Sequence, residues 1–177
     1  MNDRYLLNRR KQYNLLCTVY NKVFSEIFNR DDEDHRMKLQ KAIFCMQEMG
    51  VGFGDYGFRW DGKGPFSNQL SNDLWAIGME KQDVTDAINI INDKTLSIWQ
   101  EQAIEKANKL FAGNTTEYYN DDVFIEGLGS VLYLQRYVHP TYSTSEIGEE
   151  LSKRKPRLFN NKDKNTIMAE IAKEFTA

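Results

Sequence analysis

The stretch that decides the fold is GFGDYGFRWDGKGPFSNQL, residues 52–70, which lies between segments with helical spacing. It holds five glycines, one proline and five aromatic residues, a composition that a helix does not tolerate. Residues 56–60 alternate aromatic with small or polar side chains, as in a half-buried strand, and Asp61-Gly62 is a hairpin-turn dipeptide. The stretch therefore predicts a short aromatic strand or hairpin inside a mainly helical domain.

The end of this stretch predicts the start of the next helix. Pro65 fixes its own backbone angle and steers Gly64 away from helix, so we expect the chain to turn there. Ser67 is a good N-cap. The helix after it has inward-facing residues at Leu70, Leu74 and Ile77.

The rest of the chain has apolar residues at helical spacing. The first predicted helix, about 10–29, is expected to bury Leu16, Val19, Tyr20, Val23 and Ile27. The second is expected to bury Leu39, Ile43 and Met46 and to end at Gly50 in a left-handed conformation. This second helix covers about residues 35–49. Further helices are predicted at about 83–91, 93–110, 122–137, 146–151 and 164–175, and Trp99 is expected to face inward in the helix at 93–110.

Two helix features have a functional alternative. Asp31, Asp32, Glu33 and Asp34 precede the second helix, where acids favour its positive N-terminal end; with His35 they are also readable as a metal site, which the absence of a second ligand cluster disfavours. Gly127 and Gly129 are costly inside a helix, and we interpret them as close packing of a neighbouring segment.

Composition limits the class of protein. The 177 residues, 41% hydrophobic and 28% charged, suit one domain spanning 1–177. No apolar run approaches the roughly 20 residues of a membrane span, and the N-terminus lacks secretory-signal features, so we expect a cytoplasmic protein without membrane contact. Cys17 and Cys45 lack ligand spacing and are expected to be buried reduced thiols.

One order of motifs resembles a known family. Residues 36–44 contain Lys38-Leu39-Gln40-Lys41, and after the glycine-rich aromatic stretch comes Gly64-Pro65-Phe66-Ser67. This pattern resembles the core of the SocA/Panacea antitoxin-like domains and the related YwgA-like, phage-associated proteins. The resemblance covers about residues 36–80, with a weaker match at Ile147, Leu151 and Lys155-Pro156, and leaves residues 1–30 as an N-terminal helical extension.

The resemblance implies a mainly helical domain found on phages and mobile elements. It implies binding of a protein partner, as an antitoxin or as an adaptor that delivers a toxin to a protease or chaperone, and it implies no catalytic residue set. Its signature positions have a structural interpretation from the residues alone: Leu39 in the core, Gln40 bonding loop backbone, Gly64 and Pro65 making the turn, and Ser67 capping a helix.

The aromatic stretch also suggests a partner surface. Its aromatic side chains are too many for one face of a short strand to bury, and exposed aromatic clusters favour partner binding. We predict that the strand edge pairs with an incoming segment, with Phe53, Arg59 and Phe66 as contact residues. The alternative is that the aromatics serve core packing alone.

Two other function classes were weighed. No nucleophile, phosphate-loop, dinucleotide or metalloprotease motif is present, so we expect neither an enzyme nor a cofactor. The runner-up is a DNA-binding regulator with a winged-helix-like element and a basic cluster at Lys153, Arg154, Lys155 and Arg157. The net charge of −3 and the acidic runs at 31–34 and 146–150 argue against a continuous nucleic-acid-binding face.

Overall fold

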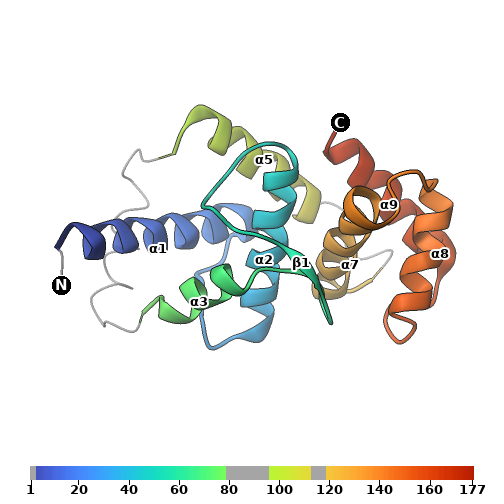
Figure 1. The fold of residues 1–177 in the computed structure, drawn as a ribbon, viewed down its shortest axis with the longest axis horizontal. Helices are drawn as coiled ribbons and strands as arrows, with labels where there is room; N and C mark the ends of the chain where they lie inside the picture. Colours follow the sequence, from blue (N-terminus) through green and yellow to red (C-terminus); the bar gives the residue numbers. More distant parts are fainter. Residues whose placement is uncertain (1–2, 79–95, 113–118) are drawn as a thin grey trace.

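The structure, a computed structural model, describes residues 3–78, 96–112 and 119–177 (Figure 1). Within them the chain is mainly helical with one small antiparallel hairpin between the second and third helices, which confirms the predicted fold class. The elements of the described residues are α1 (Asp3–Phe24), α2 (Glu33–Glu48), β1 (Arg59–Asp61), β2 (Gly64–Phe66), α3 (Asn68–Ala76), α5 (Ile98–Ala112), α7 (Asp121–Tyr133), the π-helix η1 (Leu134–Val138), α8 (Thr144–Arg154) and α9 (Lys162–Phe175).

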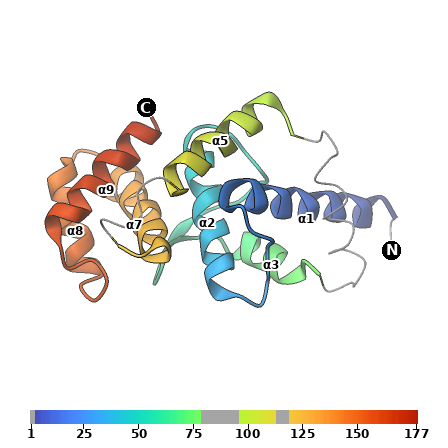
Figure 2. The same cartoon turned by 180° about the vertical axis from the view of Figure 1, so that it is seen from behind.

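The central helix is α2. Figures 1 and 2 show α1, α3 and α5 gathered around it toward the N-terminal end, and α7, α8 and α9 packed together at the other end. Every residue from Leu39 to Met46 is buried, all the way around the helix. The hairpin lies between the two helical groups, against α2 and α7. One hydrophobic core collects side chains from both groups, and α1, predicted as an extension, contributes Leu16, Val19, Tyr20 and Val23 to it.

The helix boundaries follow their capping residues. Asp32 is the N-cap of α2, where its carboxylate accepts hydrogen bonds from the amides of Asp34 and His35. Gly50 follows α2 with φ +82°, the predicted left-handed terminator. Ser67 caps α3 as predicted, accepting from the amide of Leu70 at 3.3 Å. The acidic residues at 31–34 therefore lie at the N-terminal end of α2, where Asp32 caps the helix and Glu33 and Asp34 form its first turn.

The two glycines inside α7 are contact points, as predicted. A Cβ at Gly127 would lie 2.7 Å from both the Met168 sulfur and the Phe159 ring, and one at Gly129 would lie 2.9 Å from Cδ of Lys41. Gly127 therefore lets α9 approach α7, while Gly129 makes room for the Lys41 side chain of α2.

Several predicted details were wrong. Ile27 is 64% exposed because α1 ends at Phe24 and Ser25 turns the chain with φ +58°. Trp99 is 69% exposed, because α5 begins only at Ile98 and the indole lies on the outer side of its first turn. Helix 122–137 continues as the π-helix η1 after Tyr133. The predicted helix 83–91 lies outside the described residues.

The strand is shorter than its aromatic alternation suggested. It starts at Arg59, because Tyr56 is held away from the sheet: its hydroxyl donates to Asp73 at 2.8 Å and accepts from Gln12 at 2.8 Å. Asp61 pairs with Gly64, so the loop residues are Gly62 and Lys63 and not Asp61-Gly62.

Candidate functional site: the hairpin and its surface

Two neighbouring residues of α2 fix the hairpin to the core. The side chain of Gln40 donates to the Ser67 carbonyl at 2.9 Å and accepts from the Ser67 amide at 3.0 Å, and all of these groups are buried. This is the loop-backbone role predicted for Gln40. Leu39 beside it is fully buried, as predicted. The pair of bonds sets the exit of the hairpin where Ser67 can cap α3.

A buried lysine holds the second strand. Lys41 is 1% exposed, and its ammonium donates to the carbonyl of Pro65 at 2.7 Å. Burial, with a further contribution from the nearby charge of Lys155, lowers the pKa of Lys41 to about 7. Gly64 has φ +87°, and a Cβ there would overlap the hydroxyl of Ser130, so the strand packs directly against the Ser130 side chain of α7.

A buried ion pair lies under the hairpin on its other side. Lys155 is 9% exposed and donates to the Glu126 carboxylate at 2.6 Å. Burial lowers the pKa of Lys155, while the hydrogen bond to Glu126 opposes that shift. The Lys155 ammonium also lies 5.5 Å from the centre of the Trp60 ring. The prediction that Lys155 belongs to a surface basic cluster is therefore wrong: its side chain packs into the fold and supports β1.

The half-buried side of the hairpin packs against an aromatic group from α7 and η1. We name Phe58, Trp60, Tyr133, Tyr137 and Arg154 the hairpin face. Trp60 and Tyr133 have ring centres 5.8 Å apart, Tyr133 and Tyr137 5.1 Å apart. Phe58 lies 5.2 Å from Phe44, the buried ring beneath the group. Tyr137 is 59% exposed, so the face ends in an open aromatic ring.

Charged groups border this face in pairs. The guanidinium of Arg154 lies 5.3 Å from the Trp60 ring centre and binds Glu150 at 2.7 Å. The hydroxyl of Tyr137 donates to Glu48 at 2.5 Å. Cation–π contact and ion pair together hold Arg154 beside the indole. The face thus presents aromatic rings whose positions are fixed by neighbouring charges.

The structure brings two of the three predicted partner residues together, since Arg59 and Phe66 pair across the hairpin, and it places Phe53 elsewhere. Phe53 is 1% exposed and lies in the core, where its carbonyl accepts from Gln12, so its predicted role as a surface anchor is wrong. Phe66 is half-buried at the end of β2, and Arg59 is exposed on β1 with its guanidinium 3.5 Å from the Asn68 side chain. Sequence reasoning missed Tyr133 and Tyr137, since only the fold brings a helix about 75 residues away beside the strand.

The predicted basic cluster is reduced to three exposed side chains. Lys153, Arg154 and Arg157 are exposed, whereas Lys155 is buried. Because α8 ends at Arg154, the chain turns inward at Lys155 and outward again at Arg157. Two members of the cluster, Arg154 and Lys155, contact the ring of Trp60. Two sequence features predicted separately, the aromatic strand and the basic segment, therefore meet at Trp60.

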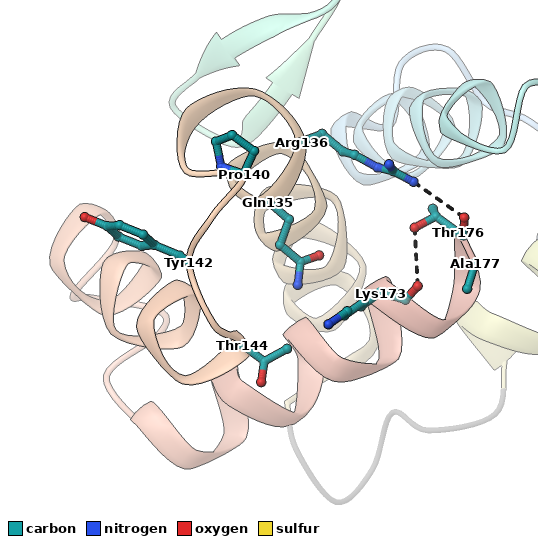
Figure 3. A pocket seen from close by; sticks show the side chains of 8 residues that line it. All are labelled: Gln135, Arg136, Pro140, Tyr142, Thr144, Lys173, Thr176 and Ala177. Atoms are coloured by element: carbon teal, nitrogen blue, oxygen red, sulfur yellow. Dashed lines mark hydrogen bonds between the residues drawn. The ribbon is translucent and has the colours of Figure 1, made fainter.

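A small cavity lies next to this surface (Figure 3). Its volume is about 330 Å³, and its walls come from η1, the loop after it and the C-terminal end of α9. Gln135 donates to the Ala169 carbonyl at 2.8 Å, and Arg136 reaches toward Thr176 (Figure 3). The cavity is lined by Gln135, Arg136, Pro140, Tyr142, Thr144, Lys173, Thr176 and Ala177. Gln135 and Arg136 therefore both connect η1 to the C-terminal end of the chain.

The histidine considered as a metal ligand, His35, lies in the first turn of α2 and is hydrogen-bonded to the loop before that helix. Nδ1 of His35 accepts from the amide of Asn29, and Nε2 lies 3.4 Å from Glu26 and 3.7 Å from Asp32. Among residues 3–78, 96–112 and 119–177, no group of three or more His, Cys, Asp and Glu side chains has the geometry to hold a metal ion. Within the same ranges no helix has the length and apolar character needed to cross a membrane.

Comparison with known proteins adds no relative: no family model, no curated protein and no solved structure matches the chain.

Proposed function

We propose that this chain is a non-enzymatic protein-interaction module that binds a partner protein through the hairpin face. The observation that carries the proposal is the meeting of Trp60, Tyr133 and Tyr137 beside Arg154, with Tyr137 59% exposed. Aromatic and arginine side chains supply most of the affinity in protein interfaces. Their fixed positions lower the entropy that binding costs.

The edge of β1 supports the same proposal. In the described part of the chain β1 pairs only with β2, so its other edge has no strand against it. An extended segment of a partner can add to such an edge through main-chain hydrogen bonds. The hairpin beneath is held by Gln40 and Lys41, which keeps that edge in place.

The resemblance to SocA/Panacea antitoxin-like domains narrows the proposal to a class of partner. We propose a cytoplasmic, mobile-element or phage-type protein that acts in the manner of an antitoxin or an adaptor, with a toxin, protease or chaperone as its partner. The positions that carry the resemblance hold the hairpin in place: Leu39, Gln40, Gly64, Pro65 and Ser67. They would therefore preserve the binding surface and not contact the partner themselves.

The DNA-binding alternative has less support. The helix before the hairpin, α2, is buried from Leu39 to Met46 and has no free face for a DNA groove. The basic segment 153–157 offers three exposed cations and not four, and one of them, Arg154, is paired with Glu150. Phosphate contacts dominate nucleic-acid affinity, so this reduction weakens the alternative.

Co-purification from the native cell tests the proposal. Tagged wild type is compared with Tyr137→Ala and Arg59→Ala, both exposed positions, and with Trp99→Ala as a matched exposed aromatic on α5. We expect one protein to co-purify with wild type and Trp99→Ala and to be lost with the other two. Equal recovery with all four folded proteins would contradict the proposal.

A further inference from the structure

The outer edge of β1 offers main-chain groups for hydrogen bonding. Trp60 lies opposite Pro65 in the register of the hairpin. Pro65 has no N–H, and its carbonyl accepts from the buried ammonium of Lys41, so Trp60 and Pro65 form a pair without hydrogen bonds between them. In such a pair the N–H and C=O of each residue point away from the other strand. The N–H and C=O of Trp60 therefore point to the outer edge of β1, where no group of the described ranges is hydrogen-bonded to them.

Two opposite charges flank Trp60 on this strand. Arg59 and Asp61 are exposed, whereas Trp60 between them is half-buried. Because side chains alternate along a strand, Arg59 and Asp61 lie on one face of the hairpin and Trp60 lies on the other. Arg59 is hydrogen-bonded to the neutral side chain of Asn68 at 3.5 Å, and neither charged residue forms an ion pair with another residue that the structure describes. Both charges are therefore available to a neighbouring strand.

This edge is complementary to itself. When a second copy of β1 is placed antiparallel, with Trp60 opposite Trp60, Arg59 of each copy lies opposite Asp61 of the other. Opposite charges that face each other across two strands stabilise the pair, whereas like charges destabilise it. The two Trp60 residues exchange both main-chain hydrogen bonds, which satisfies the groups that point outward. A segment with one sign of charge fits less well, because it meets a like charge at Arg59 or at Asp61.

The hairpin is also placed where a second copy can reach it. Its tip projects from the body between α2 and the packed helices α7, α8 and α9 (Figures 1 and 2). β2 lies on the inner side of the hairpin, against α2 and α7, so β1 is the outer strand. Lys41 and Gln40 hold the inner strand and its exit, which fixes the edge before a second copy binds and lowers the entropy that binding costs.

We infer that two copies of this chain associate through β1, in an antiparallel pair centred on Trp60 that joins the two hairpins into one four-stranded sheet. The pair is two-fold symmetric, so both copies use the same patch. The inference goes beyond the proposed partner binding, because it assigns the edge of β1 to a second copy when no partner segment is bound. A partner that adds to this edge has to displace that copy. The strand has three residues, so the interface is small and the dimer forms reversibly with protein concentration.

Charge reversal tests the pairing, because symmetry turns each single change into two like-charge pairs. Arg59→Asp sets carboxylate against carboxylate, and Asp61→Arg sets cation against cation. Mixed together, these two proteins are complementary again, and so is the double variant Arg59→Asp/Asp61→Arg with itself. Lys11→Asp on α1 is the matched reversal of an exposed cation. Sedimentation equilibrium measures the dimer dissociation constant of each protein and of the mixture, up to about 1 mM, the range of weak association.

Wild type is expected to dimerise in this range. At low salt each single reversal should weaken the dimer by roughly tenfold or more, because two attractive pairs become repulsive. The mixture and the double variant should return to within about threefold of wild type, since their opposite charges face each other again. Lys11→Asp should dimerise like wild type. Circular dichroism of every variant confirms that it is folded.

A disulfide test checks the register. Residues next to a hydrogen-bonded antiparallel pair lie opposite each other with Cα atoms about 4.5 Å apart, a distance that a disulfide can bridge. Oxidation of a mixture of Arg59→Cys and Asp61→Cys proteins should therefore give a covalent dimer. Each protein alone should give much less, because identical positions lie on a diagonal about 7–8 Å apart. Wild type, which contains Cys17 and Cys45 as free thiols, gives the background.

Several results would overturn the inference: a wild type that stays monomeric throughout the range, single variants that dimerise as tightly as wild type, or a mixture that associates no better than its components. Equal disulfide yield from the mixture and from each protein alone would also overturn it. A monomeric wild type whose co-purified partner depends on Tyr137 would keep the proposed function and leave the edge to that partner. A dimer that fits the charge pattern but recovers no partner would keep the inference and contradict the proposed function.

Discussion

Replacing Gly64 with alanine tests how tightly the hairpin is seated. Gly64 has φ +87°, and the new Cβ would lie 2.3 Å from the hydroxyl of Ser130. A non-glycine residue in that backbone region costs about 1–2 kcal/mol. Overlap in a packed site costs about 1–3 kcal/mol more. We therefore expect Gly64→Ala to lower the free energy of unfolding by about 2–5 kcal/mol, a large share of the roughly 5–15 kcal/mol of a typical domain.

Two companion variants separate the terms. Gly62→Ala lies in the loop of the same hairpin, where a Cβ has nothing within 4 Å and φ is not positive, so it should change the free energy of unfolding by less than about 0.5 kcal/mol. Ser130→Ala removes the colliding hydroxyl and leaves Ser130 Cβ at 3.4 Å as the nearest atom. The double variant Gly64→Ala/Ser130→Ala should regain about 1–3 kcal/mol relative to Gly64→Ala, because the overlap is removed. It should still lack the free energy that is lost to the strained backbone of a non-glycine residue.

Denaturant unfolding followed by circular dichroism measures all four proteins. The reasoning is refuted if Gly64→Ala and Gly62→Ala have the same midpoint, or if Ser130→Ala gives the same change in both backgrounds.

Three further predictions concern the groups around the hairpin. Gln40→Ala should cost about 1–3 kcal/mol of unfolding free energy, because it leaves the buried amide of Ser67 without a partner, while the Ser67 carbonyl keeps its bond from the amide of Ser71; urea titration measures it. Glu126→Leu should cost about 3–5 kcal/mol by leaving Lys155 buried and unpaired, and adding Lys155→Met should recover most of that loss in thermal melts. For Lys41, burial lowers the folded pKa to about 7 from the ordinary 10.5, so above pH 7 the unfolded state binds more protons and stability rises with pH. The stability difference between wild type and Lys41→Met should therefore shift in favour of wild type between about pH 7 and 8.5.

Each of these has a contradicting result. The Gln40 prediction is contradicted if Gln40→Ala has the same free energy of unfolding as Gln69→Ala, which changes an exposed glutamine on α3. The ion-pair prediction is contradicted if Glu126→Leu and the double variant Glu126→Leu/Lys155→Met are equally unstable. The Lys41 prediction is contradicted if the stability difference between wild type and Lys41→Met stays constant between about pH 7 and 8.5. Restricting that range to below about pH 8.5 excludes the thiol of Cys45 and the tyrosines, whose ordinary pKa values are 9.0 and 10.0.

The parts of the fold predicted from the sequence are those fixed by neighbours along the chain. Ser67 is a cap and Gly50 a terminator through bonds within a few residues. Gln40 was expected to bond loop backbone, although the Ser67 carbonyl that it reaches lies 27 residues further along the chain. Glycine destabilises a helix interior, so the two glycines of α7 predicted close packing. The atoms that they contact belong to Phe159, Met168 and Lys41, which lie far away in sequence.

The surface was less predictable because burial depends on distant segments. Phe53 and Trp60 belong to the same aromatic stretch, yet Phe53 is fully buried and Trp60 is half-buried beside Tyr133. In the sequence, Lys155 is one of several cations in a basic segment, and its burial depends on Glu126 in another helix. No local pattern distinguishes a buried from an exposed lysine when the partner carboxylate is about thirty residues away.

Site-specific photo-crosslinking in the native cell tests the central claim, that the hairpin face binds a protein, most directly. The photoreactive residue p-benzoylphenylalanine replaces Tyr137 on the hairpin face or Trp99 on α5, two exposed aromatic positions. The account predicts a light-dependent adduct with one protein from position 137 and none from position 99. A folded protein that gives no adduct at 137, or the same adducts from both positions, would contradict it.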